Sequence, residues 1–340
     1  MFQFTLTALI FLGFEIFLVL GLNLQFGMTG LLNLAFIMFY AAGAYTAGVL
    51  SGPPATPPSV VFIGGYNLPF YVGVLGGVAV AGVLSLIVGA LSLGRGLRSS
   101  YFTIVTLVVG VVALQFVTQY QNLFDGSIGL LNIPLPFGGG LSSNGFTYLF
   151  LGVLASVVIV CIVLCEWLRR SPFGRLLRVI REDEVAAQVF GYNVFTTKLK
   201  VYVLGGMLSG LSGAFTIFYV GAFGPGGWSV GETLFALTCI FVGGAGSTWG
   251  VLLGAAMIEL LFVQLTSLLP TIQSNPALIS IGRGIAIPLL LLIVLRFRPQ
   301  GLIPERVPKV AIAEQPANEV ATGESLSVGV SGRSEEGGDD

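Results

Sequence analysis

The sequence of 340 residues contains no histidine, so it lacks the most common metal ligand and the usual general acid or base at neutral pH. Charged residues make up only 9% of the chain, whereas a soluble globular domain carries about 25%. The three cysteines, Cys161, Cys165 and Cys239, are too few for a metal site or a disulfide framework. The phosphate-binding pattern G-x-x-x-x-G-K-S/T does not occur, so the chain binds no ATP through a P-loop. These absences argue against a soluble protein and against a membrane-embedded enzyme.

Long runs of apolar residues are the main feature of the sequence. Hydrophobic residues form 55% of the chain, its mean hydropathy is +0.93, and 48 glycines would allow helices to approach closely in lipid. Each run approaches the roughly 20 residues that a helix needs to cross a bilayer. We therefore predict an all-α polytopic membrane protein with about nine transmembrane helices, to which half-helices would add. The predicted spans are 3–24, 30–50, 70–93, 101–119, 147–168, 199–220, 231–247, 250–269 and 278–296.

The basic residues predict the orientation of these spans. Every Lys and Arg except Arg283 falls in segments that the nine-span arrangement places on one side of the membrane. The segments assigned to the other side contain no Lys or Arg; they are 51–69, 120–146, 221–230 and 270–277. Basic loops stay in the cytoplasm, so we predict an external N-terminus and a cytoplasmic C-terminus.

Two regions follow from this arrangement. Residues 1–305 are predicted to form the transmembrane domain, with its longest cytoplasmic loop at 169–198. Residues 306–340 are predicted to form an acidic, disordered cytoplasmic tail, because they are rich in Gly, Ser, Glu and Asp.

The loop 169–198 gathers charge that is scarce elsewhere. Ser171 and Pro172 are typical of a helix start, and the following residues alternate apolar and basic faces as in a helix at a membrane surface. A second, short helix is predicted between Asp183, which would cap its start, and Gly191, which would end it. A helix of about two turns is not stable alone in water. It is either a docking element for a cytoplasmic partner or an ordinary surface helix.

The stretch "SPFGRLLRVIREDEVAAQVFGYNVFTTKLKVYVLGGMLSGLSGAF" resembles the cytoplasmic loop and following helix of LivM-type permeases, membrane subunits of branched-chain amino acid ABC importers. In that family the loop carries an E-A-A-x-x-x-G coupling motif. The motif falls on Val185-Ala186-Ala187 and Gly191, with valine in place of glutamate and Glu184 beside it. Four further stretches, 27–50, 97–134, 241–255 and 296–302, are similar to the same family in the same order.

This resemblance implies a permease subunit of the bacterial cytoplasmic (inner) membrane that translocates branched-chain or other neutral amino acids. Its implied partners are a second permease subunit, two cytoplasmic subunits that bind ATP and Mg²⁺ and hydrolyse ATP, and an external solute-binding protein. The chain itself would be no enzyme, would hold no cofactor and would bind no nucleic acid. The implied ATPase-coupling residues are Arg181, Glu182, Asp183, Glu184, Ala186, Ala187 and Gly191.

Two glycine-rich segments share four residues at an offset of 202 positions: "AGAYTAGVL" (42–50) and "GAGSTWGVL" (244–252). They are either a coincidence or part of an internal repeat, in which case both are expected to be tight helix junctions lining the substrate path. By the resemblance, the loop 124–134 belongs to an outer gate; otherwise it is a plain connector. The candidate pathway and gate residues are Gly43, Tyr45, Thr46, Asp125, Gly126, Gly129, Gly243, Gly244, Gly246 and Ser247.

Glu259 and Arg283 lie on consecutive predicted spans and are candidates for an intramembrane ion pair, because a charge in the bilayer is costly unless it faces a partner or water. Two alternatives for function stay open. One is a permease of the same family for urea or short amides. The other is an ion-coupled secondary transporter, for which Glu15 and Glu259 are the available titratable residues within spans.

Overall fold

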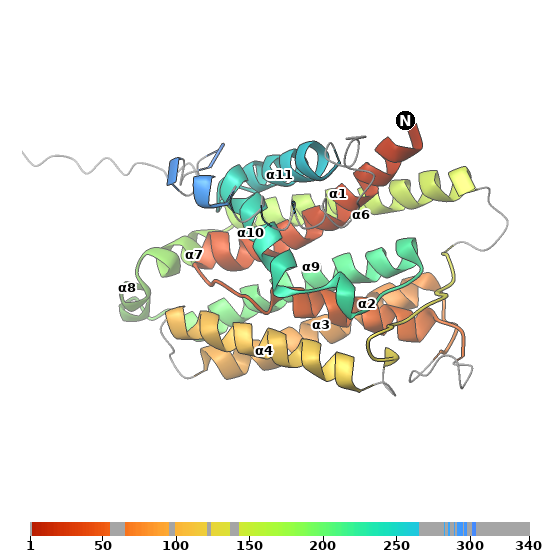
Figure 1. The fold of residues 1–340 in the computed structure, drawn as a ribbon. Coiled ribbons are helices and arrows are strands. Elements are labelled where there is room, and N and C mark those ends of the chain that lie inside the picture. Colours follow the sequence, from red (N-terminus) through yellow and green to blue (C-terminus); the bar gives the residue numbers. More distant parts are fainter. Residues whose placement is uncertain are drawn as a thin grey trace, which may run out of the picture. The chain divides into compact units, whose positions relative to one another are not determined.

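The computed structural model describes residues 2–54, 65–94, 99–120, 124–136 and 143–264, with 282, 285, 289, 291–294, 296, 297 and 301–303. These residues are almost entirely helical and, a single β-bridge aside, contain no strand (Figure 1). The elements, in chain order, are α1 (Phe2–Leu22), η1 (Asn23–Gly27), α2 (Phe36–Ser51), α3 (Phe70–Leu93), α4 (Ser99–Gln119), α6 (Ser143–Arg170), α7 (Pro172–Glu182), α8 (Glu184–Val189), α9 (Val194–Val220), η2 (Pro225–Gly227), α10 (Val230–Gly243), α11 (Thr248–Ala256) and η3 (Met257–Gln264).

Among the described residues, six helices are long and apolar enough to cross a membrane. They span Gln3–Gly27, Phe70–Leu93, Tyr101–Gln119, Asn144–Arg170, Val194–Val220 and Pro225–Gly243. Two shorter apolar helices, Phe36–Ser51 and Thr248–Leu260, fall where two further spans were predicted. The all-α, multi-pass architecture is thus confirmed. The number of nine spans and the orientation stay predictions, and most of 278–296 lies outside the described residues.

α2 begins six residues later than the sequence pattern predicts. Residues 30–35 are not helical, because Gly30 has a left-handed φ of +72° and the Asn33 side chain accepts a hydrogen bond from the Ala35 amide at 3.0 Å. This side-chain bond gives the backbone an alternative to the helix.

α9 forms the centre of the bundle and packs against α1, α2 and α3 (Figure 1). The backbones of α9 and α2 approach closely at glycines. A β-carbon on Gly213 of α9 would lie 1.9 Å from the carbonyl oxygen of Tyr40 on α2, and one on Gly43 would lie 2.1 Å from the carbonyl oxygen of Gly210. Only glycine permits such contact between membrane helices.

Loops predicted to share a side of the membrane meet in the structure. Leu130 and Phe223 exchange two backbone hydrogen bonds of 2.8 Å, which join the predicted outer segments 120–146 and 221–230. At the other end of the bundle, Arg181 donates a hydrogen bond to the carbonyl oxygen of Gly27 and so joins the loop 169–198 to the end of the first span. In both cases the segments in contact are ones that the sequence predicts to lie on the same side of the membrane.

The two glycine-rich segments do not have the same structure. Residues 42–50 lie wholly inside α2, so the expectation that both segments are tight helix junctions is wrong for this one. Its Gly43 serves close helix packing rather than a turn. Residues 244–247 do form a junction, in which Gly244 and Gly246 have φ of +117° and +82°. Arg283 and the tail 306–340 lie outside the described residues, so the ion pair with Glu259 and the domain boundary stay predictions.

Candidate functional site

The short helices of the loop 169–198 are fixed by local caps, as predicted. Ser171 accepts a hydrogen bond from the Gly174 amide at 3.3 Å, and Pro172 occupies the first position of α7. Asp183 ends α7 and starts α8: its carboxylate accepts hydrogen bonds from the amides of Val185 at 2.8 Å and Ala186 at 3.0 Å. A carboxylate at a helix start satisfies otherwise unpaired amides and opposes the positive end of the helix dipole.

Gly191 ends α8, also as predicted. Its φ is +83°, a left-handed value that glycine adopts without strain. The Gly191 amide donates to the carbonyl oxygen of Gln188 at 2.9 Å, and the Tyr192 amide donates to that of Ala187 at 3.1 Å. This pair of bonds is the Schellman pattern of helix ends, which satisfies the last carbonyl groups.

Side chains tie α8 to the bundle at two points. Arg181, just before it, contacts Gly27 at the end of η1, and Glu184 forms an ion pair with Lys198 on α9. Ala187 is fully buried against Ile180 and Val194, so its small side chain is explained by packing within this chain. The loop 169–198 is therefore joined directly to the first span and to the central helix.

Several apolar side chains on α8 and just after its end are exposed, next to the exposed polar residue Gln188. Val189 is 81% exposed and Phe190 76% exposed, and Val185 and Tyr192 are also exposed. We call these four residues the apolar face of α8. Exposed apolar patches outside the lipid-facing spans mark interaction sites. The sequence reasoning missed this face and selected the acidic and small residues, although Val185 and Val189 already stand at the i, i+4 spacing of one helix face.

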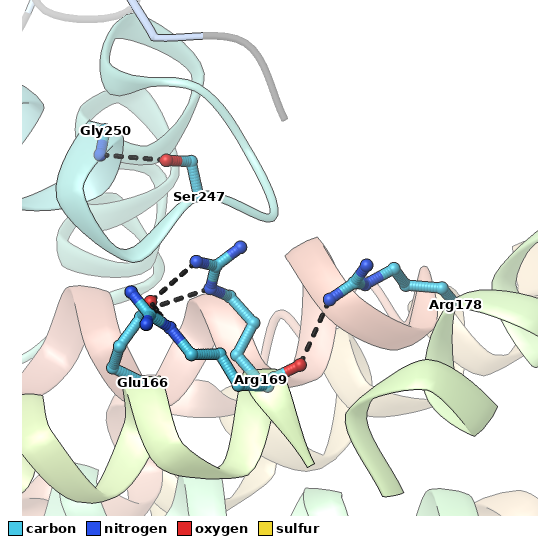
Figure 2. Close-up of polar contacts among 6 residues, drawn as sticks. Glu166, Arg169, Arg178, Ser247 and Gly250 are labelled. Atoms are coloured by element: carbon cyan, nitrogen blue, oxygen red, sulfur yellow. Dashed lines mark hydrogen bonds and ion pairs between the residues drawn. The ribbon is translucent and has the colours of Figure 1, made fainter. Parts of the chain in front are cut away.

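The α10–α11 junction lies beside the end of α6 (Figure 2). There Glu166 forms ion pairs of 2.7 Å with Arg169 and Arg170, and Arg178 donates to the Arg169 carbonyl oxygen at 3.0 Å. Ser247, a candidate pathway residue, caps α11 by accepting the Gly250 amide at 3.2 Å. The structure thus gives Ser247 a helix-capping contact at the end of the bundle that carries the loop 169–198.

Tyr45 and the candidates in the loop 124–134 lie at the opposite end. Tyr45 of α2 is buried, and its ring lies 4.6 Å from that of Phe124, 5.1 Å from that of Phe223 and 6.5 Å from that of Trp228. We call these four side chains the outer aromatic cluster. Thr46, beside Tyr45, is partly buried.

The turn beside the outer aromatic cluster has left-handed backbone at three of the predicted gate residues. Asp125, Gly126 and Gly129 have φ of +59°, +56° and +80°. A β-carbon on Gly129 would lie 2.3 Å from the Phe223 carbonyl oxygen, so glycine is required where the two loops cross. The structure therefore brings Tyr45 and Asp125–Gly129 together, and it separates them from Gly243, Gly244, Gly246 and Ser247. Sequence reasoning placed the loop 221–230 on the outer side but did not select its Phe223 and Trp228, which are more than 170 positions from Tyr45.

These observations define a helical multi-pass membrane protein that carries a short, capped helix with exposed apolar side chains at one end and two paired loops at the other. Residues 4–294 match the family described as the permease component of branched-chain amino acid transport systems, and the chain belongs to this family.

Relatives of known type agree with this membership. The chain is 29% identical, over 323 residues, to the high-affinity branched-chain amino acid transport system permease protein LivM of Salmonella typhimurium, covering 87% of this chain and 69% of that one. It is 24% identical, over 336 residues, to the probable LivM protein of Methanocaldococcus jannaschii, covering 88% and 94%. The probable LivH permease of the same organism is 25% identical over 254 residues, covering 74% and 76%.

Proposed function

We propose that this chain is the membrane-spanning subunit of an ABC importer that carries branched-chain or other neutral amino acids across the bacterial inner membrane. Family membership supports a permease of this transport system. The observation that carries the proposal is the apolar face of α8, which is exposed on a capped helix too short to be stable by itself.

In this proposal the apolar face docks on a cytoplasmic ATP-hydrolysing subunit. Burial of apolar side chains in a partner is the main source of affinity in such interfaces. Movement of that subunit would displace α8, and the contacts of Arg181 and Glu184 would pass the displacement to η1 and α9. ATP and Mg²⁺ would be bound by the partner chains, and this chain would need no cofactor.

Three kinds of partner complete the importer. A second permease subunit of similar fold is supported by the similarity to both LivM and LivH proteins. Two ATP-binding subunits would dock on the cytoplasmic side, and an external solute-binding protein would deliver substrate to the loops 124–134 and 221–230. The lipid bilayer surrounds the spans, and no nucleic acid is involved.

Two other functions are distinguished by the same assays. A permease for urea or short amides would share the docking helix and differ in substrate. An ion-coupled secondary transporter is favoured by the two carboxyl groups of Glu15 and Glu259, which are buried within the membrane part. Such a transporter would need no ATPase and would leave the apolar face of α8 without a role.

Copurification tests the proposal. The tagged chain, expressed with its neighbouring genes, is expected to retain an ATPase subunit in detergent, and the double variant Val189→Asp, Phe190→Asp is expected to lose it. Thr196→Asp, which adds one negative charge to an exposed site on α9, is the control and should retain the subunit. Uptake of labelled leucine, with alanine and urea as competitors, then identifies the substrate class. Uptake that persists without any ATPase subunit would refute the importer.

A further inference from the structure

A groove runs along the side of the bundle between α6 and α9. Both helices pack against α1, and the groove has a volume of about 350 Å³. Five of its eleven lining residues belong to α6 and four to α9, and Leu24 of η1 and Val78 of α3 complete it. None of the lining side chains is charged. Leu164 and Trp167 of α6 and Leu204 of α9 are exposed, so the groove is open on its outer side.

This groove lies within the membrane part of the chain, since α6 and α9 are both long and apolar enough to cross a bilayer. A water molecule held in a protein needs about two to four polar partners, which this mainly aliphatic lining does not offer. An empty apolar groove would lose the dispersion contacts of its walls. We therefore expect it to be filled by an apolar chain from its surroundings.

The length of the groove matches one leaflet of a bilayer. On α9 the lining residues Leu204, Leu208 and Leu211 follow Lys200 at the spacing of one helix face. A rise of about 1.5 Å per residue places Leu211 about 16 Å from Lys200 along the helix. Half of a hydrocarbon core of about 30 Å is about 15 Å. A single acyl chain that starts beside Lys200 would thus follow the groove to the middle of the bilayer.

Positive charge lies at one end of the groove. Lys200 is exposed on the face of α9 that lines it. Arg169 and Arg170 end α6 at the same end of the bundle, and both contact the single carboxylate of Glu166 at 2.7 Å, which leaves one positive charge in excess (Figure 2). Basic sites between membrane helices bind the anionic headgroups of lipids. The apolar groove and its basic end therefore match the two parts of one anionic phospholipid.

We propose that the groove between α6 and α9 binds an acyl chain of an anionic phospholipid, whose phosphate group contacts Lys200 and the basic end of α6. This lipid belongs to the leaflet on the side of the loop 169–198, and it joins the two helices that this loop connects. A helix of a partner protein fits less well, because a helix with its side chains is about 10–12 Å wide, whereas an acyl chain is a single file of methylene groups. The site depends on neither the transported substrate nor an ATPase subunit.

Quenching of tryptophan fluorescence by brominated acyl chains tests the site. The chain contains three tryptophans, so the variant Trp228→Phe, Trp249→Phe leaves Trp167, which lines the groove, as the single reporter. In nanodiscs of phosphatidylcholine, acyl-brominated phosphatidylglycerol is expected to quench Trp167 saturably. Its half-maximal mole fraction should be several-fold lower than that of acyl-brominated phosphatidylcholine. Equal quenching by the two lipids overturns the proposal.

Lys200→Gln in the same background identifies the headgroup contact. This variant is expected to lose most of the preference for phosphatidylglycerol and to keep the quenching by phosphatidylcholine, because only the charge at the end of the groove is changed. Arg175→Gln, at an exposed arginine on α7, is the control and should keep the preference. Equal losses in the two variants would show a general attraction of lipid to the basic loop and would refute the site.

Larger side chains at the open side of the groove test the acyl contact. The double variant Leu164→Phe, Leu204→Phe is expected to weaken quenching by phosphatidylglycerol several-fold. Ile159→Phe, Val163→Phe is the control, because both positions are exposed on α6 and do not line the groove. The Tm of both variants in phosphatidylcholine should equal that of the parent. Unchanged quenching in the groove variant would place the acyl chain elsewhere and contradict the proposal.

The purified complex with the second permease subunit distinguishes lipid from protein as the occupant. Quenching of Trp167 by brominated phosphatidylglycerol should persist in nanodiscs that contain this complex. If the second subunit abolishes it, the groove is an interface between proteins and the lipid site is refuted, whereas the proposed import function is unaffected.

Discussion

Glu184 and Lys198, fourteen positions apart, form the ion pair that joins the start of α8 to α9. The two partners differ in environment: the Lys198 side chain is 9% exposed and the Glu184 side chain 50%. Removing the partner of a largely buried charge is much more costly than breaking an exposed pair. The carboxylate of Glu184 therefore fixes a lysine that lies at the base of the central helix.

Neutralising this pair should impair transport more than folding. We expect Glu184→Gln and Lys198→Gln each to lower substrate uptake several-fold at equal amounts of chain in the membrane, because α8 is then tied less firmly to α9. The charge-reversed pair Glu184→Lys, Lys198→Glu should recover part of the loss. Arg175→Gln, at an exposed arginine of the loop 169–198, serves as the control. A reversed pair that transports no better than the single variants would contradict the role of the ion pair.

The sequence alone predicts the short helices of the loop 169–198 well. Ser171, Asp183 and Gly191 act on amides and carbonyl groups within a few positions, so their side-chain chemistry is sufficient to place the helix ends. Six of the predicted spans coincide with helices long and apolar enough to cross a membrane, because an apolar run of sufficient length has few other structures there. Both predictions depend on local or compositional properties.

Properties that depend on tertiary contacts were not predicted. Ala187 looked available to a partner but is buried by Ile180 and Val194. Phe223 and Trp228 were not selected, because their approach to Tyr45 results from the pairing of two distant loops. Gly43 was read as a junction residue, whereas it allows α2 to contact α9. A single sequence does not state which partner a glycine or an aromatic ring meets.

Gly191→Ala should weaken the end of α8 through the backbone alone. No atom lies within 4 Å of a β-carbon at this position, so an added methyl group meets no obstacle. The left-handed φ of +83° still costs a non-glycine residue about 1–2 kcal/mol. We expect faster hydrogen exchange in residues 184–192 and weaker retention of the ATPase subunit.

Asparagine tolerates the left-handed conformation better than alanine, so Gly191→Asn should lie between alanine and the parent. Hydrogen exchange of residues 184–192, measured by mass spectrometry on the three proteins, ranks them by the stability of the α8 end. Equal exchange in Gly191→Ala and the parent would show that the Schellman bonds do not depend on glycine here.

Gly213→Ala should destabilise the central helix contacts. The added carbon would lie 1.9 Å from the Tyr40 carbonyl oxygen, so α2 and α9 must move apart. Overpacking of this kind costs about 1–3 kcal/mol. Gly152→Ala on α6 is the matched control, because nothing lies within 4 Å of its β-carbon and alanine favours a helix. Thermal unfolding in detergent should show a decrease in Tm for Gly213→Ala and no decrease for Gly152→Ala. Equal changes in the two variants would contradict the close contact between Gly213 and Tyr40.

Asn23→Leu should loosen the α10–α11 junction from the first span. The Asn23 side-chain oxygen accepts the Gly246 amide at 2.9 Å, and Asn23 itself is buried. Leucine of similar size fills the space but leaves that amide unpaired, at a cost of about 1–3 kcal/mol.

Gln3→Leu is the control for this substitution, because the bond from Gln3 to Asn144, at 2.7 Å, is exposed and water replaces it. The measurement is thermal unfolding combined with hydrogen exchange over residues 243–250. A lower Tm and faster exchange for Asn23→Leu alone are expected. If both variants lose stability equally, the change in side-chain volume, and not the loss of the Gly246 hydrogen bond, accounts for the effect. The junction would then be held by the packing of Gly243 against Gly250, because a β-carbon on Gly243 would lie 2.1 Å from the Gly250 carbonyl oxygen.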